Sequence, residues 1–352
     1  MKKLPDSSPG LDSLPHRGAR WGGPPLRNGV GVGARAPTIQ SNETPAESAQ
    51  SLLQRLEWTV IRRLDGLLQG DFATLMRGTG IDLADLREYQ HHDDVRHIDW
   101  NVTARLQQPH VRVFTEDREM AAWFLLDLSP SIDFGSGERA KHQVLTEFVG
   151  TLARLLTRHG NRVGALLYGD GVDAQLPARS SRKHVLQLLH TITTRPVLDA
   201  SGPTRLHELL AAAAHTVRQR STVFVVSDFV CEPGWSQPLA QLAQRHDVVA
   251  VRLLDPLEQA LPDLGLIPMR DAETGEQLMV DTHNPGFRRR FAQIAAEREA
   301  GLRSDLARAG VDTLELSTND DLLEALLRFV DLRKRRKQVS RHRLPAHLKL
   351  AA

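Results

Sequence analysis

Cysteine is nearly absent from this sequence, and long apolar runs are missing altogether. The single cysteine, Cys231, excludes a disulfide within the chain and favours a reducing compartment. No stretch approaches the roughly 18 consecutive apolar residues that a membrane-spanning helix needs. The first residues, Met-Lys-Lys, are not followed by the apolar segment of a secretory signal. These absences predict a cytoplasmic protein without a membrane span.

Charge is nearly balanced over the whole chain but unevenly distributed along it. The 352 residues carry 45 lysines and arginines and 43 aspartates and glutamates. From Arg333 onward there are eight basic residues and no acidic ones, so the rest of the chain is acidic. Such an ending is typical of a solvated helix end, and the alternative is contact with RNA, anionic lipid or an acidic partner.

Composition divides the chain into four parts. Residues 1–46 are rich in proline, glycine, serine and arginine, and they carry too little apolar surface to offset their conformational entropy, which predicts disorder. Residues 47–119 combine an amphipathic helix, predicted over about residues 46–68, with a dense polar region. Residues 120–337 carry the main domain, and residues 338–352 form a basic tail without periodic apolar residues.

Strands and helices alternate through the main domain. Continuous apolar runs, which are typical of parallel strands buried on both faces, occur in AAWFLLDL, RVGALLYG, STVFVVSDF, HDVVAVRLLD and VDTLELST. Helical periodicity predicts helices over residues 139–158, 183–193, 206–219, 237–244, 287–309 and 320–337, with a short hairpin at 268–281. The order predicts an α/β fold with an open, mostly parallel sheet and helices on both faces.

Oxygen-bearing side chains stand where the predicted strands end. Asp127 ends one strand and is followed by Ser129 and Ser131, Asp228 ends another, and Thr204 lies in a loop before a helix. Open α/β sheets bind ligands beyond the carboxyl ends of their strands, where the strand order reverses. Few carboxylates with several hydroxyls suit Mg²⁺, with Mn²⁺ or Ca²⁺ left open.

Two conformations of the serine-containing loop are compatible with the sequence. In an extended loop, alternate residues point the same way, which predicts that Asp127, Ser129 and Ser131 reach one cation. The alternative is a serine-rich turn that caps the helix after Gly137.

The series Asp-x-Ser-x-Ser, a later threonine and a later aspartate resembles the metal-ion-dependent adhesion site of von Willebrand factor A domains. The resemblance implies that Ser129, Ser131 and Thr204 bind the metal directly. It implies that Asp127 and Asp228 act largely through water. It also implies an open coordination position that accepts a carboxylate from a partner protein.

The segment REYQHHDDVRHIDWNVTAR, residues 87–105, and the VRVFTEDRE that follows it resemble the bacterial domain-of-unknown-function family fifty-eight. The similarity covers about residues 70–329. Members are encoded beside MoxR-type AAA+ ATPases and are thought to act with them in assembly, activation or metal insertion. The resemblance therefore implies a MoxR-type ATPase or its client as partner. Some members carry membrane helices before this segment, whereas this chain has only the N-terminal segment and one amphipathic helix there.

The charges of residues 87–105 predict an ion-pair network that holds this region against the sheet, with a docking surface as the alternative. Trp100 is expected to be a core or interface anchor. The charged residues of this network are Arg87, Asp93, Asp94, Arg96, Asp99 and Arg105.

Signals of catalysis are missing from the sequence. A phosphotransferase that uses Asp127 would need a second aspartate two residues on, where Ser129 stands. No P-loop, G-x-S-x-G or H-E-x-x-H pattern occurs. The histidine nearest to the serines, His142, falls on a predicted helix face. We therefore expect a non-catalytic adaptor, with a metal-dependent hydrolase or phosphatase, or a nucleic-acid-binding protein using the basic tail, as alternatives.

Overall fold

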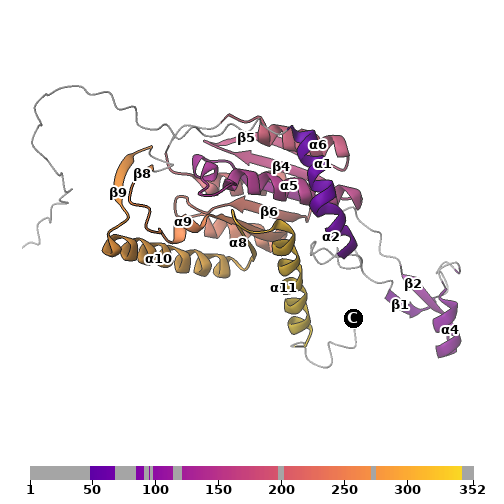
Figure 1. Ribbon diagram of the computed structural model, residues 1–352. Helices are drawn as coiled ribbons and strands as arrows, with labels where there is room; N and C mark the ends of the chain where they lie inside the picture. The colour runs from indigo at the N-terminus through magenta and orange to yellow at the C-terminus, as the bar shows by residue number, and fades with distance from the viewer. Residues whose placement is uncertain are drawn as a thin grey trace, which may run out of the picture. The chain divides into compact units, whose positions relative to one another are not determined.

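Six strands form a central sheet in the spatial order β10-β7-β6-β3-β4-β5 (Figure 1). Neighbouring strands are parallel except for β5, which pairs antiparallel with β4 at one edge. The bounds are β3 (Ala121–Asp127), β4 (Arg162–Tyr168), β5 (Val172–Arg179), β6 (Thr222–Ser227), β7 (Asp247–Leu254) and β10 (Asp312–Ser317). The predicted α/β fold with a mostly parallel central sheet is confirmed.

This computed structural model describes residues 48–67, 85–90, 95, 98–113, 121–196, 202–270 and 275–342. The segment predicted to be disordered, residues 1–46, lies outside these ranges. Residues 343–352, most of the predicted basic tail, also lie outside them.

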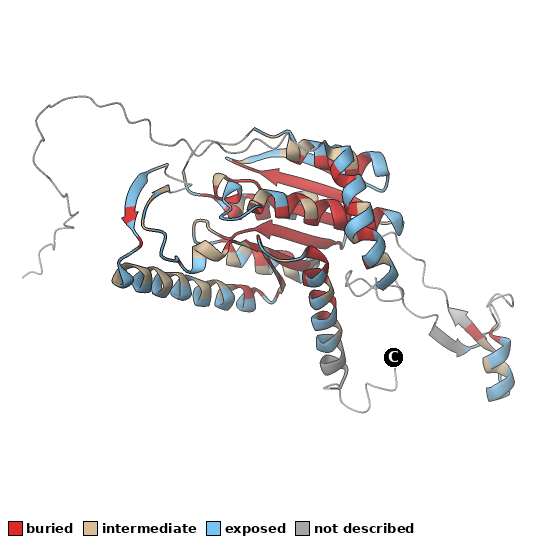
Figure 2. Ribbon diagram, viewed as in Figure 1, coloured by how far each residue is buried: buried red, intermediate tan, exposed pale blue. Residues whose placement is uncertain are grey.

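Helices cover both faces of the sheet. Their bounds are α5 (Lys141–Arg158), α6 (Arg182–Thr193), α7 (Leu206–Thr216), α8 (Ser236–Arg245), α9 (Pro256–Gln259), α10 (Pro285–Ala309) and α11 (Leu322–His342). Side chains of a strand alternate between the two faces, so Phe124 packs with Phe148 and Phe224 on the side of α5. Its neighbour Trp123 belongs to the core under α7 and α8. Figure 2 shows the inner strands of the central sheet buried, whereas α10 is mostly exposed or intermediate.

The predicted N-terminal amphipathic helix packs onto the first of these faces. It runs through α1 (Ala49–Leu56), the π-helical η1 (Glu57–Ile61) and α2 (Arg62–Leu67), and α1 contacts α5 and α6. Leu52, Leu53 and Leu56 are buried in the same core as Phe124. Because this helix completes the core, it contributes to stability.

The polar segment before β3 forms β1 (Asp85–Glu88), α4 (Trp100–Leu106) and β2 (His110–Val113), with β1 and β2 antiparallel. Asp99 caps α4, because its Oδ1 accepts hydrogen bonds from the backbone N–H groups of residues 101 and 102 at 3.0 and 3.2 Å. Trp100 is 70% exposed, so it is not a core anchor. The predicted ion-pair network falls largely outside the described residues, since Asp93, Asp94 and Arg96 belong to the undescribed ranges.

The hairpin that the sequence predicted forms β8 (Leu266–Arg270) and β9 (Gln277–Asp281). The edge strand β5 was not predicted, because VDAQLPAR contains a proline and is mostly solvent-exposed. Helix α7 ends three residues earlier than predicted, and α11 continues to His342, beyond the predicted boundary of the tail at 337.

Arg333, the first residue of the basic C-terminal run, is buried in the fold rather than solvated. Arg333 is 3% exposed and bonds to Asp247 Oδ1 and Asp312 Oδ2, each at 2.7 Å. Arg336 also bonds to Asp312, at 2.7 Å. These ion pairs fasten α11 to β7 and β10, so part of the positive charge is already neutralised within the fold.

Replacing Arg333 by methionine is expected to lower the free energy of unfolding by about 3–5 kcal/mol at pH 7, because buried carboxylates lose their partner. Burial alone would raise the pKa of Asp312, but Arg333 and Arg336 hold it below its ordinary value of 3.8. A lowered folded-state pKa contributes stability above about pH 4 that is lost as the pH falls through the folded-state pKa. The loss in the variant should therefore shrink in urea unfolding below that pH. Arg335→Met, at an exposed position, is the control, and an equal loss in both variants would contradict the assignment.

Candidate functional site at the carboxyl ends of β3 and β6

The strand order reverses beside β3. From β3 the chain forms β4 and β5 on one side, and then returns to form β6, β7 and β10 on the other. Asp127 is the last residue of β3, and Asp228 follows the last residue of β6, its hydrogen-bonded neighbour. Both carboxylates thus lie at the position where open α/β sheets bind ligands.

Asp127 is fully buried and accepts hydrogen bonds only from neutral donors among the described residues. Ser227 Oγ donates to its Oδ2 at 2.6 Å, and the Ser129 N–H donates to its Oδ1 at 3.1 Å. Burial, together with the charge of Asp228, raises the pKa of Asp127 to about 6, although the hydrogen bonds from Ser227 and Ser129 act against this. Asp127 is therefore a buried carboxylate whose charge lacks a compensating cation within the described structure.

Ser129 and Ser131 place two hydroxyls next to Asp127. Both side chains are buried, and their Oγ atoms lie 3.2 Å apart. The loop is not extended as predicted, because Pro130–Asp133 forms a 3₁₀ turn with the proline at its first position. The alternative prediction of a helix cap is wrong, because the N-cap of α5 is Ala140 and its N–H is satisfied by the side chain of Gln143.

Asp228 is held by a buried lysine that the sequence did not indicate as part of the site. Lys141 Nζ lies 2.7 Å from Asp228 Oδ2 and 2.7 Å from Glu258 Oε1, and Lys141 itself is 0% exposed. The other oxygen of Asp228 accepts the Val230 N–H at 3.0 Å. Burial would lower the pKa of Lys141, but the two carboxylates outweigh this and raise it. Asp228 is thus compensated, whereas Asp127 is not.

A signal for Lys141 was available in the sequence. It is the first residue of α5, and a positive charge in the first turn opposes the helix dipole. An unfavourable position of this kind indicates a specific partner, here the carboxylates at the strand ends.

Thr204 lies in the loop before α7 and is buried. Its backbone oxygen accepts the N–H of Glu232, which lies in the segment after β6, at 2.9 Å. The N–H of the next residue, Arg205, donates to the hydroxyl of Tyr168 at the end of β4. The loop is therefore attached to the end of β4 and to the segment after β6, the two strands that neighbour β3.

A further buried carboxylate, Asp255, fixes the far end of the loop after β3. Asp255 accepts hydrogen bonds from Ser136 N and Oγ at 2.9 and 2.5 Å and from Thr318 Oγ1 at 2.8 Å. Burial would raise the pKa of Asp255, but these hydrogen bonds and one from Leu257 lower it. Asp255 is satisfied by the fold and acts as a structural tie between the loop, β7 and β10.

The histidine nearest in sequence to the two serines is His142, on α5. Burial lowers the pKa of His142, and the charge of Asp133 acts against this. Among the described residues, His142 forms no hydrogen bond with Ser129 or Ser131. Within the same residues, no three histidine, cysteine or acidic side chains come together to hold a metal. A cation at this site would therefore depend on the hydroxyls as ligands.

This fold and site define an α/β protein with carboxylates and hydroxyls at the switch point of its sheet. A family model described as "Protein of unknown function DUF58" matches residues 85–301. An uncharacterized protein of Mycobacterium tuberculosis is 35% identical over 301 residues, covering 85% of this chain and 94% of the relative. The chain therefore belongs to the DUF58 family.

A shorter relative comes from Paracoccus denitrificans and is described as an uncharacterized protein in the moxR 3′ region. It is 34% identical over 105 residues, which cover 29% of this chain and 99% of the relative. The family resemblance inferred from residues 87–105 is thus confirmed, and one relative is located beside moxR.

Three solved structures resemble the chain at low similarity. A conserved hypothetical protein, BatB, from Bacteroides thetaiotaomicron has a TM-score of 0.40 and 15% identity, covering 61% of this chain and 99% of that chain. An aerotolerance-related membrane protein from Bacteroides fragilis has a TM-score of 0.39 and 13% identity, covering 61% of this chain and 98% of that chain. An uncharacterized membrane spanning protein from Vibrio fischeri has a TM-score of 0.21 and 22% identity, covering 61% of this chain and 98% of that chain.

The predicted cytoplasmic location is contradicted by these comparisons, because two of the three proteins are described as membrane proteins. The prediction rested on the missing apolar runs, which say nothing about association with a membrane. In the part of the chain that the structure describes, no helix has the length and apolarity to cross a bilayer.

Proposed function

We propose that this chain is a non-catalytic adaptor that binds a partner protein through a divalent cation, in the manner of a von Willebrand factor A domain. The observation that carries the proposal is Asp127, a buried carboxylate without a compensating cation beside two buried hydroxyls. Mg²⁺ is the preferred ion, and Mn²⁺ or Ca²⁺ would satisfy the same oxygens. The residues that would hold it are Asp127, Ser129, Ser131, Thr204 and Asp228.

The spacing of the two serine hydroxyls fits this ion. Adjacent ligands of octahedral Mg²⁺, each about 2.1 Å from the metal, lie about 3.0 Å apart. The Ser129 and Ser131 oxygens are 3.2 Å apart, close to that spacing.

The charges fit as well. Both oxygens of Asp228 already accept hydrogen bonds, from Lys141 and from Val230. This supports the inference that Asp228 acts through water rather than as a direct ligand. The cation would then mainly neutralise Asp127, and would supply the positive charge to which a partner's carboxylate binds.

The proposed partner is a MoxR-type AAA+ ATPase or its client. Support comes from the Paracoccus denitrificans relative, which is described by its position in the moxR 3′ region. The functional setting would be assembly or activation of a client complex.

The test is binding of the purified MoxR-type ATPase encoded nearest to this chain, measured with Mg²⁺ and with EDTA. Binding should be lost in EDTA while circular dichroism shows a folded chain, because a partner carboxylate would then face Asp127 and Asp228 without a cation between them. AAA+ ATPases also bind Mg²⁺ with nucleotide, so the assay is run without nucleotide and repeated with Asp127→Asn in Mg²⁺. Binding that survives both treatments would reject the metal-dependent interface and direct attention to residues 87–105.

A further inference from the structure

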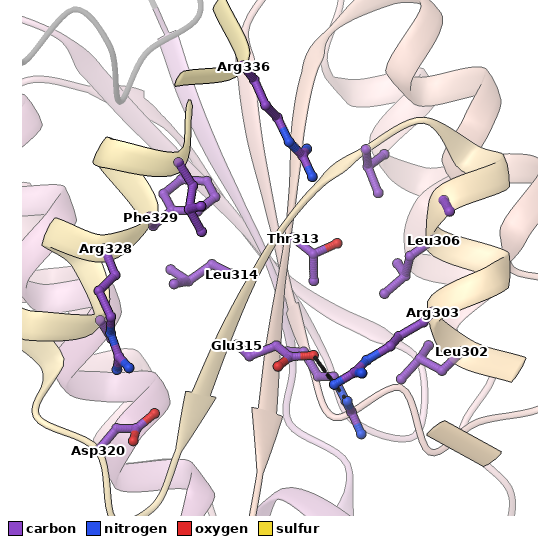
Figure 3. Close-up of a pocket in the computed structure, with 15 residues that line it drawn as sticks. Leu302, Arg303, Leu306, Thr313, Leu314, Glu315, Asp320, Arg328, Phe329 and Arg336 are labelled. Atoms are coloured by element: carbon purple, nitrogen blue, oxygen red, sulfur yellow. Dashed lines mark hydrogen bonds and ion pairs between the residues drawn. The ribbon is translucent and has the colours of Figure 1, made fainter. Parts of the chain in front are cut away.

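The open edge of the sheet lies at the bottom of a cleft far along the sheet from Asp127. Strand β10 ends the sheet, and α10 and α11 flank it on opposite faces (Figure 3). The cleft between them has a volume of about 490 Å³, within the range of peptide and ligand sites. Its apolar lining includes Leu314 of β10, Leu306 of α10, and Phe329 and Leu332 of α11.

The backbone of β10 still offers hydrogen bonds along this edge. The Thr318 N–H donates to the Leu254 carbonyl oxygen. In a parallel pair, the backbone N–H and C=O groups of alternate residues point to the same neighbouring strand, so those of the even-numbered residues of β10 bond to β7. Odd-numbered residues therefore direct their N–H and C=O groups outward. Both backbone groups of Ser317 are satisfied by Asp320. The Ser317 N–H donates to Asp320 Oδ2 at 3.1 Å, and the Asp320 N–H donates to the Ser317 carbonyl oxygen at 3.1 Å.

Two outward-facing residues remain, Thr313 and Glu315. Within the described residues, neither has a backbone partner on this side, and both line the cleft. Unpaired strand edges are positions at which an extended segment adds as a further strand.

The walls of the cleft carry excess positive charge. Four arginines and two carboxylates line it. Arg252 and Arg303 are partly neutralised by Glu315 and Glu299, and Arg336 by Asp312. Arg328 is exposed and has no hydrogen bond or ion pair within the described residues. Leu332, 59% exposed on the same wall, adds apolar surface beside it.

We propose that β10 is a docking edge for an extended acidic segment of a partner protein, whose backbone pairs with Thr313 and Glu315 while its acidic and apolar side chains alternate. Because alternate side chains of an added strand point to opposite faces, the carboxylates would meet Arg328 and Arg336 on the side of α11, and the apolar side chains would pack against Leu302 on the side of α10. Residues 2–35 and 343–349 of this chain are basic and do not have the required charge, and we assign the occupant to a partner molecule. This surface is separate from the proposed cation site.

The test uses the full chain and a fluorescein-labelled synthetic peptide of alternating glutamate and valine, followed by fluorescence anisotropy. The glutamate peptide should bind, with affinity that falls as salt rises, and a lysine–valine peptide should not. Arg328→Glu should weaken binding by about tenfold or more, whereas Arg298→Glu, at an exposed position of α10 outside the cleft, should change it by less than about twofold. Asp127→Asn should bind the peptide like the wild type, which separates this proposal from the cation site.

Strand addition is tested separately from charge. Thr313→Pro removes an outward N–H without touching the ladder to β7, so it should weaken binding in a protein that melts like the wild type. N-methylation of alternate peptide amides should abolish binding for one set of positions and spare it for the other. Absence of binding by the glutamate peptide, equal binding of the two peptides, or equal effects of Arg328→Glu and Arg298→Glu would overturn the proposal. Full binding by peptides methylated at either set would overturn the strand pairing.

Discussion

Asparagine at position 127 is expected to abolish the binding of one Mg²⁺ without unfolding the cation-free protein. The substitution removes the buried carboxylate of Asp127, which has no positively charged partner among the described residues. The asparagine side chain has nearly the same volume as the aspartate side chain. Isothermal titration calorimetry should show one site in the wild type and none in Asp127→Asn. At a Mg²⁺ concentration a hundred times its dissociation constant, the wild type should gain about 2.7 kcal/mol of stability and the variant nothing.

The cation-free variant is also expected to be at least as stable as the cation-free wild type. The pKa of Asp127 is raised from 3.8 to about 6, so keeping it ionised at pH 7 costs roughly 3 kcal/mol at about 1.4 kcal/mol per pKa unit. Asparagine avoids this cost. Asp133→Asn, at an exposed position of the same loop, is the control and should retain Mg²⁺ binding. Equal Mg²⁺ uptake by wild type and Asp127→Asn would reject the cation site.

Methionine at position 141 is expected to destabilise the protein by about 3–5 kcal/mol in EDTA, because it leaves Asp228 as an uncompensated buried charge beside Asp127. Removing the ammonium also increases the negative charge at the site, so Mg²⁺ should restore more stability to the variant than it adds to the wild type. Thermal melts with Mg²⁺ and with EDTA measure both effects.

Lys183→Met is the matched control for Lys141→Met, since Lys183 is exposed in the first turn of α6. It should change neither the melting temperature nor its response to Mg²⁺. If Lys141→Met melts like this control in EDTA, the buried ion pair does not contribute to stability. If Mg²⁺ restores nothing to the variant, the cation does not bind near Asp228.

Lys141 and Asp228 also show where the prediction of the site was incomplete. The pattern Asp-x-Ser-x-Ser after an apolar run located Asp127, Ser129 and Ser131 at a strand end, and β3 does end at Asp127. The ion pair from Lys141 joins residues 87 positions apart in the sequence. No local pattern reports a contact of that range, and only the opposition of Lys141 to the helix dipole gave an indirect indication.

The sequence alone determined the α/β class, the succession of most strands and helices along the chain and most helix boundaries, because the apolar periodicity of each segment is a local property. Strand β5 was not predicted from the sequence, since an edge strand that is half exposed lacks a continuous apolar run. The structural role of Arg333 in fastening α11 to the sheet was not predicted either, because Arg333 belongs to a basic run in the sequence. Only the packing of α11 brings Asp247 and Asp312 close to it.

Tertiary structure alone decided which charges are compensated and which backbone groups are left open. The same five oxygen-bearing residues appear in the sequence without distinction, yet packing gives Asp228 a buried ammonium and gives Asp127 only neutral donors. Likewise, the place of β10 at the edge of the sheet depends on the spatial order of all six strands. Electrostatic compensation and strand exposure depend on distances between remote segments, which is why they emerge only when the chain is folded.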